Sequence, residues 1–248
     1  MNPSPFQTPI NLDQHAFFVG TTGAGKTHRA TLQILARASQ LDRAGVPPEV
    51  GKILIFDTKP VGYGEDSERG NFYDLPGTIF HDWRDYDPKR IPTRIAIYRP
   101  PDEDISPTVF NAFLGYLRGI RYRASSGDVS PMPMTVVFDE LTDIITSDGK
   151  RVVYLQNLDK LLRQGRSSLQ TLWIETQYPA YIDATIKRLT TCRFMFRLPD
   201  PKDRKLMEGF FGTKLVGAKI PYRFGFWYQN DLIEATTMMP LFFTGEAA

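Results

Sequence analysis

A glycine-rich octapeptide, GTTGAGKT at residues 20–27, joins two segments whose hydrophobic patterns differ. The segment before it, residues 15–19, is a short apolar run that predicts a strand. In the segment after it, Leu32, Leu35 and Ala36 recur at helical spacing up to about Gln40. We therefore expect a strand, a glycine-rich loop and a helix in immediate succession.

The residue types in this octapeptide suit the binding of phosphate groups. The glycines let backbone N–H groups turn toward an anion, Lys26 can reach β- and γ-phosphate oxygens, and the Thr27 hydroxyl can ligate Mg²⁺. The following helix adds the positive end of its dipole. We expect ATP and Mg²⁺ to bind at this loop, which consists of Gly20, Thr21, Thr22, Gly23, Ala24, Gly25, Lys26 and Thr27.

Short apolar strands and amphipathic helices alternate along the rest of the chain. Strands are expected at residues 52–57, 94–99, 134–139, 171–175 and 193–198, and helices at residues 108–122, 152–164 and about 202–210. Parallel neighbouring strands need long crossovers, so this alternation predicts an α/β fold with a mostly parallel sheet covered by helices on both faces. The aromatic tail at residues 220–243 is strand-like and could add an edge hairpin.

The composition is that of an ordinary globular protein, with 42% hydrophobic and 23% charged residues. Residues 1–14, with three prolines, are expected to form an arm, and residues 15–248 a single domain. The net charge of +2 means that any basic surface for a nucleic acid must be local. The single cysteine, Cys192, excludes an internal disulfide, and no apolar run approaches the roughly 20 residues that span a bilayer. We expect an intracellular protein.

An acidic pair follows the predicted strand at residues 134–139. Asp139 ends the apolar run MTVVFD, and Glu140 comes directly after it. Taken alone, such a pair is usually a solvated turn or the start of a helix. A phosphate site, however, needs an acidic group to hold Mg²⁺ through water and a base to orient the attacking water. Beside the glycine-rich loop, the pair predicts Asp139 as a Mg²⁺ residue and Glu140 as the catalytic base.

Gln177 follows the next apolar strand, residues 171–175, in the run TQYP. It lies at the carboxyl edge of the predicted sheet, where parallel sheets bind ligands. A polar side chain there could connect the γ-phosphate or the attacking water to the rest of the sheet. In isolation it is only a loop glutamine, but after the acidic pair we assign it a sensor role in catalysis.

Together these segments resemble the FtsK/HerA superfamily of DNA-pumping ATPases. The resemblance covers about residues 17–206, and its elements occur in the family's order: GTTGAGKT, IFDTKP with Asp57 and Lys59, VVFDE, QGRSSLQTLWIETQYP and RFMFRLPDPKDRK. The first motif is specific for a nucleotide only. Its combination with FDE, GR and TQYP is much more specific for this superfamily.

The resemblance implies a RecA-like P-loop fold of the ASCE class. It also implies a homo-oligomeric ring, expected to be a hexamer, in which ATP hydrolysis at subunit interfaces drives double-stranded DNA through a central channel. In this family pattern Arg166 would reach the neighbouring subunit's nucleotide, since a guanidinium stabilises charge on the transferred phosphoryl group. Arg163 is the competing residue, and a cation favoured at a helix C-terminus is the structural explanation for Arg166.

Within the superfamily, a lone motor segment resembles the genome-packaging ATPases of tailless icosahedral viruses with an internal membrane. Conjugation or plasmid-transfer ATPases and filamentous-phage assembly ATPases usually carry membrane segments or extra domains, and they are the alternatives. The viral setting implies a capsid or membrane-vertex protein as a partner, and a location in the host cytoplasm or at the virion vertex.

The DNA contacts are harder to derive from the sequence. Arg118, Arg121 and Arg123 form a basic run beside Tyr122, but such a run is usually a solvated face. The three tryptophans, Trp83, Trp173 and Trp227, are expected in the core or in interfaces, because double-stranded DNA offers no unstacked bases.

Two functions from other classes stay open. A small P-loop kinase for a nucleoside or nucleotide would transfer the phosphate to an acceptor, and it would not need a water-activating glutamate beside the Mg²⁺ aspartate. A non-catalytic assembly module would use ATP only to stabilise a protein complex.

Overall fold

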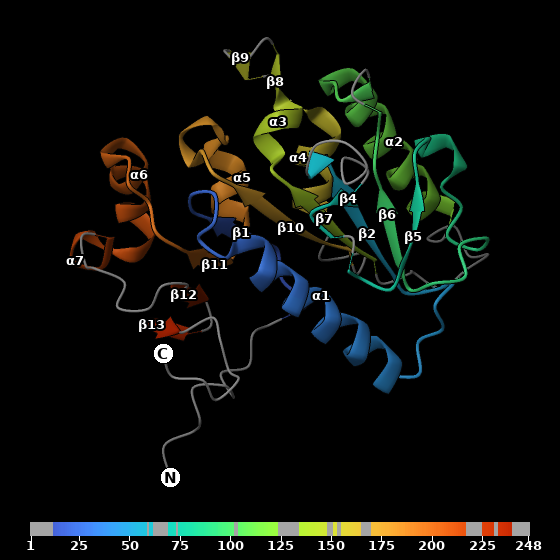
Figure 1. Cartoon of the computed structure of the whole chain (residues 1–248), viewed down its shortest axis with the longest axis horizontal. Coiled ribbons are helices and arrows are strands. Elements are labelled where there is room, and N and C mark those ends of the chain that lie inside the picture. The colour runs from blue at the N-terminus through green and yellow to red at the C-terminus, as the bar shows by residue number, and fades with distance from the viewer. Residues whose placement is uncertain are drawn as a thin grey trace.

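The computed structural model describes residues 12–58, 60–61, 69–72, 74–101, 104–123, 134–147, 151–152, 155–164, 170–216, 225–230 and 233–239. These residues form an α/β fold around a nine-stranded sheet (Figure 1). From one edge to the other, the strands are β13 (Ile233–Met239), β12 (Phe226–Asn230), β11 (Cys192–Met195), β1 (Ala16–Val19), β10 (Gln170–Thr176), β7 (Met134–Asp139), β2 (Lys52–Asp57), β6 (Ile95–Tyr98) and β5 (Gly77–Phe80). The strands from β11 to β5 are parallel, whereas β12 is antiparallel to both of its neighbours, β11 and β13.

Helices fill most of the connections between these strands. They are α1 (Lys26–Arg43), α2 (Pro107–Arg123), α3 (Leu141–Ile145), α4 (Gln156–Gln164), α5 (Ala184–Leu189), α6 (Pro201–Phe211) and α7 (Thr213–Val216). Two small antiparallel pairs lie outside the main sheet: β3 (Pro60–Val61) with β4 (Arg69–Gly70), and β8 (Thr146–Ser147) with β9 (Arg151–Val152). No helix formed by the described residues has the length and hydropathy of a membrane span.

Two apolar layers cover the faces of the sheet. Side chains alternate along a strand, so Ile53 and Ile55 of β2 pack with α1, whereas Leu54 and Phe56 pack with α2, α3 and α4. Figure 1 shows α1 crossing one face, with the other large helices on the opposite side. The predicted parallel sheet with helices on both faces is therefore confirmed, and β12 with β13 forms the expected hairpin at its edge.

The strand predictions at residues 52–57 and 134–139 match β2 and β7 to the residue. The helix expected at residues 152–164 begins only at Gln156, because Val152 belongs to the short strand β9. Among the elements that were not predicted are the edge strand β5 and the helices α3, α5 and α7. Each is only four to six residues long, which is too short to show a hydrophobic period.

The helix after the glycine-rich loop is confirmed, but its buried face is not the one that the apolar spacing indicates. Leu35 is 41% exposed, whereas Ile34 beside it is fully buried. The buried face also carries Arg29 and Arg37, which have specific partners. The Arg29 guanidinium lies over the rings of Phe194 and Phe226, at 5.8 and 5.2 Å from their centroids. These partners are distant in sequence, so local periodicity could not reveal them.

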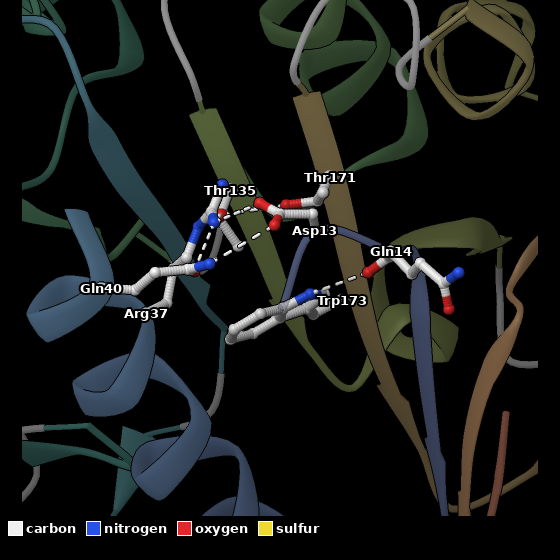
Figure 2. Close-up of polar contacts among 7 residues, drawn as sticks. All are labelled: Asp13, Gln14, Arg37, Gln40, Thr135, Thr171 and Trp173. Carbon is white, nitrogen blue, oxygen red and sulfur yellow. Dashed lines mark hydrogen bonds and ion pairs between the residues drawn. The ribbon is translucent and has the colours of Figure 1, made fainter. Parts of the chain in front are cut away.

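The residues just before β1 form polar contacts with α1 and the sheet (Figure 2). Asp13 forms an ion pair with Arg37, whose Nε also donates to the Thr135 hydroxyl at 3.3 Å. The Trp173 indole N–H donates to the carbonyl of Gln14 at 3.2 Å. Residues 13 and 14 thus bind the core, while residues 1–11 of the expected arm lie outside the described residues.

The two neighbouring positions on α1 give a matched test of its orientation. Ile34→Ala should lower the free energy of unfolding by about 2–5 kcal/mol, because it empties a packed site. Leu35→Ala should lower it by less, by about 1 kcal/mol at most, because that side chain is 41% exposed and packs only in part. Urea denaturation followed by circular dichroism measures both, and a larger loss for Leu35→Ala would contradict this helix orientation.

Candidate nucleotide site

The order of three strands brings the predicted motifs together. Strand β10 lies between β1, which leads into the glycine-rich loop, and β7, which ends at Asp139. Val19 pairs with Thr176 across β1 and β10, and Ile174 pairs with Phe138 across β10 and β7. The carboxyl ends of all three strands therefore meet at one edge of the sheet, which is where open α/β sheets bind ligands.

The loop at residues 20–27 has a conformation that needs its glycines. A Cβ atom on Gly20 would lie 2.6 Å from the Cβ of Phe196, and Gly23 and Gly25 have φ angles of 71° and 97°. Gly25 is the N-cap of α1, whose first turn contains no acidic residue. The Lys26 ammonium donates to the carbonyl of Thr21 at 3.2 Å, so the lysine lies against the loop. This geometry leaves a helix N-terminus and a cation together, as phosphate binding requires.

Asp139 is buried at the end of β7 and is held by groups from the neighbouring strand and loop. Its carboxylate accepts a hydrogen bond from Asn71 Nδ2 at 2.5 Å, and its carbonyl accepts one from the Thr58 hydroxyl at 3.0 Å. Asp57 lies beside Asp139 in the register of β2 and β7 and pairs with Arg99 at 2.9 Å. Burial raises the pKa of Asp57, and Arg99 opposes this rise. Sequence reasoning missed Asn71 and Arg99, whose roles depend on tertiary contacts.

Glu140 has a backbone conformation that is rare for a residue with a side chain. Its φ angle of 56° lies in the left-handed region, which costs about 1–3 kcal/mol unless the surroundings fix it. Its buried carboxylate accepts hydrogen bonds from the hydroxyls of Thr142 and Thr176, the latter at 2.9 Å. It also accepts the backbone N–H of Gln177 at 2.9 Å. Strain at this position and several converging donors indicate a functional side chain.

Gln177 connects Glu140 to the glycine-rich loop. Its backbone binds the Glu140 carboxylate, and its side-chain oxygen accepts a hydrogen bond from the Thr22 hydroxyl at 2.6 Å. The residue expected to act as a sensor therefore lies between the loop and the expected base. Tyr178 follows it and is half exposed.

Glu175 is a site residue that sequence reasoning missed. It is completely buried on β10, and its Oε2 accepts a hydrogen bond from the Thr27 hydroxyl at 3.2 Å. Burial raises its pKa well above the ordinary 4.5, and the nearby Asp139 carboxylate raises it further, while Lys26 opposes the rise. The available signal was an acidic residue at the end of an otherwise apolar strand, two positions before Gln177.

The oxygen groups at this edge fit the expected Mg²⁺ ion. In the residues that the structure describes, no three His, Cys, Asp or Glu side chains form a metal cage. Mg²⁺ in nucleotide sites does not need one, because waters and substrate phosphates supply most of its ligands. The Thr27 hydroxyl and the buried Asp139 carboxylate supply hard oxygen donors for the ion. These residues would hold the ion, which when bound would polarise the phosphate oxygens.

The structure tests the arginine predictions only in part. Arg166 and Gly165 lie outside the described residues. Arg163, at the end of α4, forms an ion pair with Asp159 at 2.9 Å, one turn earlier. In the basic run, Arg118 donates to the side-chain oxygen of Asn157 at 2.7 Å, and the side chains of residues 121–123 lie outside the description.

The tryptophan prediction is confirmed. Trp173 is buried, and Trp83 and Trp227 pack partly buried against the core.

The raised pKa of Glu175 has a consequence for stability in the absence of nucleotide and metal. Between pH 4.5 and the higher pKa of the folded state, the folded chain keeps a proton that the unfolded chain releases, so stability falls as pH rises. Glu175→Gln cannot ionise, so the variant does not lose stability in this way as pH rises. The variant should be at least as stable as the wild type at pH 7, and the difference should shrink as pH falls toward 4.5. Urea denaturation across pH measures this, with the exposed Glu49→Gln as the control; a variant less stable at pH 7 would contradict the assignment.

No protein-family model matches the sequence, and no curated protein matches it either. Among solved structures, the genome packaging NTPase B204 from Sulfolobus turreted icosahedral virus 2, in complex with ATP-gammaS, is similar, with a TM-score of 0.66 and 13% sequence identity. The match covers 93% of this chain and 99% of B204. B204 has also been solved with AMP and with AMPPCP.

Two secretion ATPases share the fold over part of their length. The cytoplasmic domain of the type VII secretion ATPase EccC from Thermomonospora curvata has a TM-score of 0.60 and 16% identity, over 90% of this chain and 25% of that one. ATPases 2 and 3 of EssC from Geobacillus thermodenitrificans have a TM-score of 0.52 and 16% identity, over 88% of this chain and 38% of theirs. At these identities the likeness concerns the fold, and the chain has the α/β fold of the P-loop NTPases.

Proposed function

We propose that this chain is a Mg²⁺-dependent ATPase that translocates double-stranded DNA, and that its setting is the packaging of a viral genome. The observation that carries the ATPase part is the contact chain from the glycine-rich loop through Gln177 to Glu140. A loop that only binds a nucleotide does not need a strained, buried carboxylate connected to it. Hydrolysis uses such a group, because a base orients the attacking water and accepts its proton.

Each residue at the edge of the sheet then has a role. The N–H groups of the loop and Lys26 bind the phosphates, and Thr27 with Asp139 holds the Mg²⁺ ion. Glu140 accepts the proton of the attacking water, and Gln177 senses whether a γ-phosphate lies beside Thr22. Hydrolysis would thereby change a contact between the loop and the carboxyl end of β10.

The DNA part of the proposal rests on the sequence resemblance and on the shared fold. B204 is a genome packaging NTPase from an icosahedral virus, and it matches this chain almost end to end. A homo-oligomeric ring, expected to be hexameric, would let a few cations per subunit bind the phosphates of a duplex that passes through it. A capsid or membrane-vertex protein would be the partner that holds such a ring in place.

A ring also provides the place for an arginine that acts in trans. We assign this role to Arg166, because the GR pair precedes strand β10 as in the resembled family. Arg163 is the competing residue, but its guanidinium is engaged by Asp159 within α4. Turnover of Arg166→Ala and Arg163→Ala, compared at saturating ATP, decides which of the two acts.

Replacing the proposed base separates binding from hydrolysis. Glu140→Gln keeps an oxygen that can accept the hydrogen bonds from Thr142, Thr176 and Gln177, so the fold should persist. It should bind ATP with the affinity of the wild type and lose about 10²–10⁴-fold in turnover, because it cannot take a proton. A phosphate-release assay with parallel equilibrium binding measures both, and Glu49→Gln is the control. Wild-type turnover in Glu140→Gln would remove this residue from the mechanism.

The motor function predicts that DNA and assembly affect hydrolysis. The ATPase rate should rise when double-stranded DNA is added, and a non-hydrolysable ATP analogue should shift the protein to a ring-sized species in light scattering. DNA-independent hydrolysis by a strict monomer would contradict the motor. Phosphate transfer to a nucleoside in the same assay would instead indicate a kinase, and ATP binding without turnover an assembly module.

A further inference from the structure

Strand β10 carries a buried carboxyl group that the proposed roles do not use. Glu175 has no exposed surface, although acidic residues are almost never fully buried without a partner. Among the residues that the structure describes, only one of its two carboxyl oxygens has a hydrogen-bond partner: Oε2 accepts the hydrogen bond from Thr27, and Oε1 is buried with none. An unsatisfied polar atom in a buried site costs about 1–3 kcal/mol, so its presence needs an explanation.

Three charged groups lie near the Glu175 carboxyl group. The carboxyl group lies on the α1 side of the sheet, close enough to Asp139, Lys26 and Glu140 to interact with their charges. Thr27, its hydrogen-bond partner, is the residue expected to ligate Mg²⁺. An apolar residue at this position of the strand would pack without a penalty. Lys26 is the cation among these groups, and its ammonium donates to the Thr21 carbonyl, so a second cation or a water bound to one would stabilise a carboxylate here.

We propose that Glu175 is a positioning residue of the Mg²⁺ site, in which its Oε2 orients the Thr27 hydroxyl and its Oε1 binds the water shell of the ion. The inference rests on the Mg²⁺-nucleotide part of the proposed function and does not depend on DNA. Groups that hold a metal ligand in place affect metal affinity strongly, and their replacement typically weakens it about 10–100-fold. With Glu175 in the site, nucleotide binding would depend more strongly on Mg²⁺ than it would with Thr27 and Asp139 alone.

The test measures metal dependence rather than activity alone. ATP-gammaS binding is followed by calorimetry in EDTA and at increasing MgCl₂, for the wild type, Glu175→Gln and the exposed control Glu49→Gln. Glu175→Gln should need about 10–100-fold more free Mg²⁺ for half-maximal binding, while its affinity in EDTA is unchanged or tighter. Its turnover at saturating MgCl₂ should fall far less than that of Glu140→Gln, because the proposed base is intact.

Four results would overturn the inference. An unchanged Mg²⁺ requirement in Glu175→Gln would show that the carboxylate does not act on the ion. Equal loss of ATP-gammaS affinity with and without Mg²⁺ would show a structural role, and loss of turnover with an unchanged Mg²⁺ requirement would show a catalytic one. A wild type that binds ATP-gammaS equally well in EDTA would contradict the proposed Mg²⁺ site itself, and this inference with it.

Discussion

Strand β10 forms hydrogen bonds on one side with the strand that leads into the glycine-rich loop, and on the other with the strand that ends at Asp139. This position decides which side chains meet. Because side chains alternate along a strand, Glu175 contacts Thr27 on the α1 face, while Thr176 contacts Glu140 on the opposite face. A shift of one residue in register would exchange the two. The shift would also exchange Trp173, which packs on the α1 face, with the smaller Leu172 and Ile174 on the opposite face.

The elements that the sequence predicts well are those whose signal is local. Residues 52–57 and 134–139 are apolar runs of strand length, and both match observed strands. Asp139, Glu140 and Gln177 directly follow or end such strands, so the parallel fold brings them to one edge once the strand order is known. Most of the fold and the main residues of the candidate site could therefore be derived before the structure.

The residues that sequence reasoning missed are those whose meaning depends on distant partners. Glu175 looks like the polar end of a strand until Thr27 is placed beside it, and Asn71 looks like a loop residue until its amide binds Asp139. The buried face of α1 was misjudged for the same reason. Arg37 is buried there because Asp13 and Thr135 satisfy its charge and N–H groups. Neither contact can be inferred from the spacing of apolar residues along the helix.

A strand-displacement measurement tests the central claim most directly. A third oligonucleotide strand is bound to double-stranded DNA as a triplex, and its release is followed while the protein hydrolyses ATP. The account predicts release by the wild type only with ATP and MgCl₂, and no release by Glu140→Gln, whose base is absent. Hydrolysis by the wild type without any release of the third strand, or release that does not require ATP, would contradict a DNA-translocating motor.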